Sequence, residues 1–195
     1  SINMKTQSLT PQAYGEISGS YGSFNSHRES VNIGTGLLSG GWAFNARLSN
    51  IGSDGYRDRA STDLKSYFFQ GGYYGKNTVL KFITYGGKEK TYHAWYGITK
   101  AEMDDPQLGR RYNPCGAIEG AHGETLGFYD DQTDNYLQYN YQLLFSRKLS
   151  DRLNLNVNLH YTDGEGFYEQ YKNDEKLSKY LLGPFDIPDG AGGTT

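Results

Sequence analysis

The sequence predicts an all-β protein whose strands run antiparallel to one another. Aromatic residues make up 15% of the chain, and strands are enriched in such residues. Apolar and polar residues alternate with a period of two over several long segments, which is the pattern of a strand with two different faces. Short turns alternate with long connections between these segments, as expected of a series of hairpins.

The alternation defines about seven long strands. In chain order they lie at residues 13–22, 30–37, 42–49, 63–74, 78–86, 137–146 and 153–162. The last strand has the clearest pattern, with Leu155, Val157 and Leu159 on one face and Asn156 and Asn158 on the other. A capping-box pattern in residues 99–102 predicts one short helical turn.

The connections differ in length between the two ends of these strands. Residues 39–41, 75–77 and 150–152 form tight turns, whereas residues 52–62, residues 87–134 and the segment from residue 163 onward are longer. The first connection, residues 25–27, is short where this order predicts a longer one. Tight turns on one side and long loops on the other are typical of an outer-membrane β-barrel. A loop of more than about 15 residues is uncommon in a compact soluble domain.

Alternation alone leaves two folds open, because the apolar face of each strand can point into a protein core or out to lipid. A soluble β-sandwich or small barrel would have the same period. The outer-membrane barrel is favoured by polar faces rich in Asn, Gln, Ser and Gly, and by strands longer than the usual ~5–6 residues. Aromatic residues near the predicted strand ends also fit a girdle at the membrane interface, namely Tyr21, Trp42, Tyr73, Tyr74 and Tyr161.

Composition and charge argue against several classes of function. The net charge of −3 lacks the basic excess of a nucleic-acid-binding surface. Cys115 is the only cysteine, so no intrachain disulfide or multi-cysteine metal site is expected. The histidines are not spaced as metal ligands, and His160 is expected to make a structural hydrogen bond. The acidic pairs at residues 104–105 and 130–131 are expected to be solvated, so we expect no enzyme, metal or cofactor.

Several motifs occur along the chain in an informative order. They are residues 2–6 (Ile-Asn-Met-Lys-Thr), the Gly-rich segment 14–22, residues 35–38, 42–49, 53–60 (Ser-Asp-Gly-Tyr-Arg-Asp-Arg-Ala), 111–114 and 159–169. In this order they resemble the TonB-dependent outer-membrane receptors, over essentially the whole chain. Residues 53–60 are the most specific and look like the second extracellular loop of that family.

The resemblance implies a fragment of a transmembrane β-barrel. Residues 1–6 would be the last strand of the plug domain, and residues 7–195 the N-terminal portion of the barrel. This portion would supply about seven strands of a roughly 22-stranded antiparallel barrel. The sequence departs from the family in lacking nearly the entire plug, the TonB box and a terminal aromatic strand, and its last residues would lie within an extracellular loop.

The resemblance also implies a function in the bacterial outer membrane. Such receptors take up an iron complex, either a siderophore or haem, or a similar scarce nutrient, with energy supplied by TonB. The implied partners are TonB through the plug, the small-molecule ligand, and membrane lipid with lipopolysaccharide, but not nucleic acid. The alternative is a non-transporting outer-membrane or surface β-protein, such as an adhesin or a passive porin.

Two loop clusters are candidates for ligand binding. The first consists of Tyr56, Arg57, Asp58 and Arg59, and the second of His93, Trp95, Tyr96, Arg110, Arg111 and Tyr112. Aromatic rings and charge-assisted hydrogen bonds suit an anionic ferric complex. For the first cluster the alternative is a salt-bridged loop that shapes the barrel rim. For the second, the alternative is packing against lipid headgroups or between loops.

Overall fold

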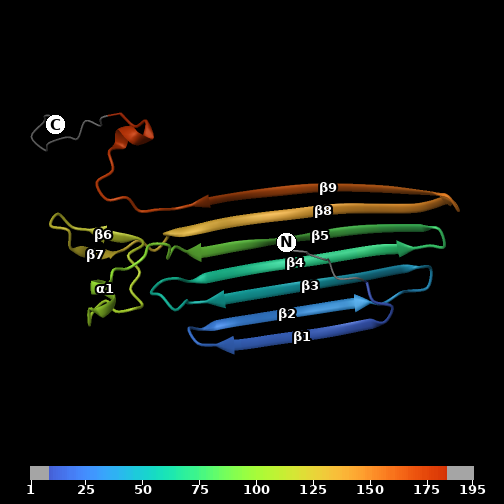
Figure 1. Ribbon diagram of the computed structural model, residues 1–195, viewed down its shortest axis with the longest axis horizontal. Coiled ribbons are helices and arrows are strands. Elements are labelled where there is room, and N and C mark those ends of the chain that lie inside the picture. The colour runs from blue at the N-terminus through green and yellow to red at the C-terminus, as the bar shows by residue number, and fades with distance from the viewer. Residues whose placement is uncertain (1–8, 184–195) are drawn as a thin grey trace, which may run out of the picture.

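The main feature of the molecule is one antiparallel sheet of seven strands (Figure 1). The computed structural model describes residues 9–183. The strands are β1 (Ala13–Gly22), β2 (Ser26–Thr35), β3 (Trp42–Ser53), β4 (Thr62–Tyr74), β5 (Thr78–Tyr92), β6 (Ala117–Glu119), β7 (Thr125–Phe128), β8 (Thr133–Ser150) and β9 (Leu153–Tyr168). The helices are α1 (Lys100–Asp104) and the 3₁₀ helix η1 (Leu177–Tyr180). Strands make up 58% and helices 5%, so the predicted all-β antiparallel class is confirmed.

Each strand of the sheet lies beside its neighbour in sequence, in the order β1-β2-β3-β4-β5-β8-β9. The step from β5 to β8 is interrupted by α1 and by the separate β6–β7 hairpin. The expected plug strand, residues 1–6, lies outside the described residues. Within residues 9–183, no helix is long and apolar enough to cross a membrane.

The strands are longer than predicted on the side of the long connections. β5 continues to Tyr92, and β8 begins at Thr133. The pairing of Lys88 with Leu137 and of Tyr92 with Thr133 keeps the backbones in register, although the apolar alternation has ended there. β9 likewise extends to Tyr168.

Two predicted boundaries near the N-terminal strands were wrong. The first turn is formed by residues 23–25 and not 25–27, because Phe24 and Asn25 adopt left-handed φ angles of 59° and 52°. The second strand does not reach Leu37, because the chain turns at Gly36 with φ 67°. A Cβ on Gly36 would lie 2.5 Å from the backbone nitrogen of Ala13, so this close approach requires glycine. The predicted helical turn is confirmed as α1, with its capping box.

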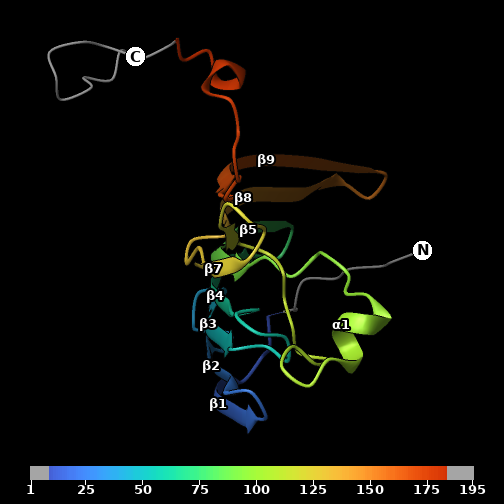
Figure 2. The ribbon, with the colours of Figure 1, turned by 90° about the vertical axis from the view of Figure 1, so that its left-hand side faces the viewer.

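The two ends of the sheet differ as expected. At one end, here called the turn end, the connections are residues 36–41, 75–77 and 151–152. At the other, here called the loop end, they are residues 23–25, 54–61 and 93–132, and the chain leaves β9 there (Figure 1, left). Seen from the loop end, the segment that carries α1 projects to one side of the sheet (Figure 2).

The pairing register separates two faces of opposite character. The face here called apolar carries Ile17, Val31, Ile33, Phe44, Leu48, Phe69, Phe82, Leu143, Val157 and Leu159. Its side chains are open to the surroundings: Ile17 is 85%, Leu48 64% and Leu159 60% exposed. The face here called polar carries Ser30, Asn32, Asn45, Gln70, Gln142 and His160. On it Asn45 is 3% and Gln70 1% exposed, which inverts the usual arrangement of a water-soluble sheet.

The seven-stranded sheet is not closed on itself. β1 and β9 form its two edges, and every residue of the 16-residue strand β9 is exposed. A long edge strand with unpaired backbone groups is a template for pairing with a further strand.

Candidate functional site

Arg57 ties the β3–β4 connection to the long β5–β8 connection at the loop end. Its guanidinium donates hydrogen bonds to the carbonyl oxygens of Ala94 (2.7 Å), Tyr96 (2.8 Å) and Tyr112 (2.9 Å). These acceptors lie 37 to 55 residues away along the chain. The planar fork of five N–H donors lets one side chain hold three carbonyls. Arg57 therefore holds the two connections together, and three hydrogen bonds of its guanidinium go to backbone carbonyls of the protein.

Asn113 is the buried centre of this loop assembly. Its side chain is fully buried. Its Nδ2 donates to the carbonyl oxygens of Asp58 (3.0 Å) and His93 (2.9 Å), and its Oδ1 accepts the backbone N–H of Cys115 (3.1 Å). Three segments that are distant in sequence thus meet at one amide.

Arg59 packs in the same assembly. It donates a hydrogen bond to the carbonyl oxygen of Asn113, and its guanidinium lies 3.4 Å from the centroid of the Phe128 ring. That contact brings β7 onto the loops through a cation–π interaction. Beside it, the Tyr92 hydroxyl donates to the carbonyl oxygen of Tyr129 (2.7 Å), and the carbonyl oxygen of Cys115 lies 3.3 Å from it as an alternative acceptor. Burial raises the pKa of the Tyr92 phenol.

Asp58 and Arg111 form the outer layer of the assembly. The Nε of Arg111 lies 3.5 Å from the Asp58 carboxylate and also donates to the carbonyl oxygen of Tyr56 at 3.0 Å. The Arg111 guanidinium lies 5.5 Å from the ring centroid of Phe24, which meets the Tyr56 ring edge-on at 5.4 Å. Both charged groups are partly exposed, so this ion pair contributes little by itself.

An aromatic cluster begins where β5 ends. The His93 ring stacks on Trp95 at 3.8 Å between centroids, and Tyr168 lies 6.3 Å away at the end of β9. His93 is buried, whereas Trp95 and Tyr96 are exposed. Burial lowers the pKa of His93 and the Asp134 carboxylate opposes that effect, so the ring favours its neutral form. This cluster offers flat apolar surface with little charge.

The ten sequence-predicted residues thus divide into two groups. Arg57, Asp58, Arg59, Arg111 and, through its carbonyl group, Tyr112 bind other loop segments. Tyr56, Trp95, Tyr96 and Arg110 are exposed, and His93 is buried beneath Trp95. The predicted site residues did not include Asn113, Tyr92 or Phe128, although Asn113 lies within the motif at residues 111–114. Among the described residues, no three His, Cys, Asp or Glu side chains converge as metal ligands.

The apolar face carries aromatic residues at both of its borders. Near the turn end, Trp42 contacts Tyr73 and Phe44, with ring centroids 5.2 Å and 6.1 Å apart. Toward the loop end, Tyr67 lies 6.3 Å from Tyr139. Another aromatic pair of this border, Tyr141 and Tyr161, is stacked at 6.2 Å. On β9 the apolar alternation runs from residue 153 to residue 161, close to the roughly 9–11 residues of a tilted transmembrane barrel strand.

Comparison of the chain with models of known protein families and with curated protein sequences finds no match.

Proposed function

We propose that this chain is the N-terminal part of the barrel of a TonB-dependent outer-membrane receptor. The observation that carries the proposal is the inverted sheet, with exposed apolar side chains such as Leu48 on one face and buried amides such as Gln70 on the other. Lipid solvates the apolar face of such a sheet, and a polar lumen suits the amides. The open edges at β1 and β9 would pair with further strands of the barrel, since lipid does not tolerate unpaired backbone groups.

In this proposal the chain belongs to the bacterial outer membrane, and the loop end faces outward. The receptor takes up an iron complex, a siderophore or haem, or a similar scarce nutrient. TonB supplies the energy through a plug. Exposed Tyr56, Trp95, Tyr96 and Arg110 would contact the ligand, while Arg57, Arg59 and Asn113 hold the loops that present them. Binding residues on loops that a rigid scaffold positions are a common arrangement.

The experiment that tests the membrane part compares neighbouring positions with opposite orientation. Single cysteines replace Leu48 or Leu159 on the apolar face and Ser49 or Asn158 on the polar face, in the full native polypeptide with Cys115→Ala. After spin labelling in bilayers, labels at positions 48 and 159 should be relaxed by oxygen and shielded from a polar relaxing agent. Labels at positions 49 and 158 serve as matched controls with lower oxygen access. Equal access at all four positions, or shielding of 48 and 159 from both agents, would refute a lipid-facing sheet.

A passive porin or adhesin is the second candidate, and the engagement of Arg57 by three backbone carbonyls favours it. An arginine whose N–H groups already donate to backbone carbonyls has fewer hydrogen-bond donors left for an anionic nutrient. The two candidates differ in their energy dependence. Uptake of a labelled ferric complex by cells should stop when the inner-membrane proton gradient is collapsed if the protein is a receptor. Uptake that continues without the gradient, or no uptake at all, would favour the alternative.

A further inference from the structure

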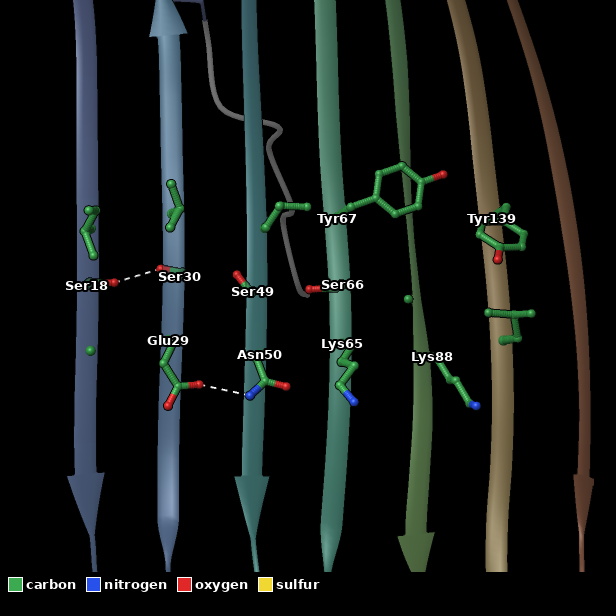
Figure 3. Close-up of a pocket in the computed structure, with 16 residues that line it drawn as sticks. Ser18, Glu29, Ser30, Ser49, Asn50, Lys65, Ser66, Tyr67, Lys88 and Tyr139 are labelled. Carbon is green, nitrogen blue, oxygen red and sulfur yellow. Dashed lines mark hydrogen bonds between the residues drawn. The ribbon is translucent and has the colours of Figure 1, made fainter.

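A hollow of about 510 Å³ lies at the loop end, between the segment that follows β9 and the connection from β7 to β8. Another hollow lies on the apolar face and is lined by strand residues (Figure 3), whereas the loop-end hollow is walled by connecting segments and by η1. Its lining includes Tyr129, Tyr171, Tyr180, Glu169, Lys172 and Glu175. Its volume falls within the range of about 300–1,000 Å³ that is usual for ligand sites.

Hydrogen bonds to the loop assembly fix the segment that follows β9. The Tyr171 N–H donates to Oε1 of Gln132 at 2.8 Å, and the Gln132 side chain is buried. Gln170 donates to the Tyr96 hydroxyl at 2.9 Å. The Asn173 side chain bonds the backbone of β6, at 3.0 Å to an N–H and at 3.3 Å to a carbonyl oxygen. The wall of the hollow is therefore ordered in advance, which reduces the entropy that a ligand loses on binding.

Tyrosine rings form the apolar part of the lining. The ring centroids of Tyr129 and Tyr171 lie 6.0 Å apart, and the rings are tilted by 38°. Tyr129 is held by its backbone, since its N–H donates to the carbonyl oxygen of Gly116 and its own carbonyl accepts the Tyr92 hydroxyl, both at 2.7 Å. Tyr180 adds a third ring from η1 and is exposed. Each ring combines a flat apolar face with a hydroxyl group at its tip.

The charged groups of the lining nearly balance one another. Glu175 is paired with Lys179 at 2.5 Å. Glu169 and Lys172 carry opposite charges, and neither forms an ion pair within residues 9–183. The lining therefore favours neither an anion nor a cation. It offers a carboxylate that accepts hydrogen bonds and an ammonium group that donates them.

We propose that this hollow binds a neutral oligosaccharide. A pyranose ring has apolar C–H faces that stack on tyrosine, and its hydroxyl groups both donate and accept hydrogen bonds. Glu169 accepts bonds from these hydroxyls and Lys172 donates to them, and such charge-assisted bonds are stronger than neutral ones. The inference goes beyond the proposed uptake of an iron complex, because none of the exposed residues proposed to contact that complex lines this hollow.

The test screens the full native polypeptide for binding to an array of oligosaccharides, in a detergent without a sugar headgroup. The probes are neutral oligosaccharides of glucose, galactose, mannose and xylose, and sialylated and sulfated oligosaccharides serve as the charged reference. We expect binding to members of the neutral set. Isothermal titration calorimetry with the bound neutral oligosaccharide then compares the variants.

Two conservative substitutions test the stacking and the hydrogen bonds separately. Tyr171→Ala should weaken binding at least about tenfold, whereas Tyr171→Phe keeps the ring and most of the affinity. Glu169→Gln keeps the shape and should weaken binding about tenfold, as expected for the loss of a hydrogen bond to a charged group. The matched controls are Tyr21→Ala and Glu16→Gln, which change exposed residues of β1 outside the hollow and should leave binding unchanged.

Three outcomes would overturn the proposal. One is the absence of binding to every neutral oligosaccharide. Another is preferential binding of the charged reference set. The third is equal affinity in Tyr171→Ala and Tyr21→Ala together with equal affinity in Glu169→Gln and Glu16→Gln, which would place the sugar elsewhere. The measurement needs neither an iron complex nor a proton gradient, so its failure leaves the proposed uptake function untouched.

Discussion

Replacing Asn113 with alanine is the sharpest perturbation of the loop assembly. The substitution removes three hydrogen bonds and leaves two carbonyl groups and one N–H unpaired in a buried place. Each unsatisfied buried group costs about 1–3 kcal/mol, and partial relaxation toward water reduces the sum, so we expect a local loss of about 3 kcal/mol. This corresponds to about a hundredfold increase in local opening.

Hydrogen exchange of the full polypeptide in detergent, followed by mass spectrometry, measures this local opening directly. Peptides covering residues 93–132 should lose about two orders of magnitude of protection, while peptides within β2, β3 and β4 should keep theirs. The matched control is Asn50→Ala, which removes one exposed hydrogen bond to Glu29 and should leave the 93–132 segment unchanged. Unchanged protection in Asn113→Ala, or equal effects of the two variants, would refute the view that this amide holds the loops together.

Three further predictions concern the same end of the molecule. Arg57→Lys keeps the charge but cannot reach three carbonyls at once, so proteolysis of the 93–132 segment should accelerate nearly as much as in Arg57→Ala; full protection in the lysine variant would contradict this. Gly116→Ala should destabilise the same segment in thermal melts, because Gly116 has φ 76° and a Cβ there would lie 2.4 Å from the Tyr92 hydroxyl; an unchanged melting curve would argue otherwise. The pKa of His93 is lowered below its usual 6.5, so its contribution to stability is complete above pH 6.5 and is lost as the pH falls through that value toward the lowered pKa. Proteolysis of the loop should therefore accelerate below pH 6.5, and this dependence should be absent in His93→Gln.

The strand pattern was predictable because alternate residues of each strand lie on one apolar face of the sheet. On β9, Leu155, Val157 and Leu159 lie on that face, and the pairing of Leu159 with Leu143 confirms that the two strands share it. The pattern fails where the apolar face ends but the backbone pairing of the strands continues. Lys88 and Lys90 continue the ladder of β5 without an apolar face, so the strand end was placed too early.

The loop assembly could not be predicted in the same way. Arg57 and Asn113 bind backbone groups, which every residue offers, and their partners lie up to 55 residues away. No side-chain pattern records such contacts. The two predicted segments, residues 56–59 and 93–112, contact each other in this assembly. The gathering of aromatic and basic residues did not separate the side chains that hold the loops from those that remain exposed.

On the apolar face, Leu48 and Tyr67 are followed toward the loop end by a charged row with Asn50, Lys65 and Lys88. This step bears on whether lipid or a protein core would cover the face. A second sheet packed on this face would bury the apolar row and the charged row alike, since stacked sheets lie only about 10 Å apart. Burial of the Lys65–Asp63 ion pair and of Lys88 away from water would then cost several kcal/mol. In the proposed membrane the same row would reach the polar headgroups, where both lysine charges would remain solvated. The charged row therefore supports the proposed lipid-facing orientation independently of the apolar residues.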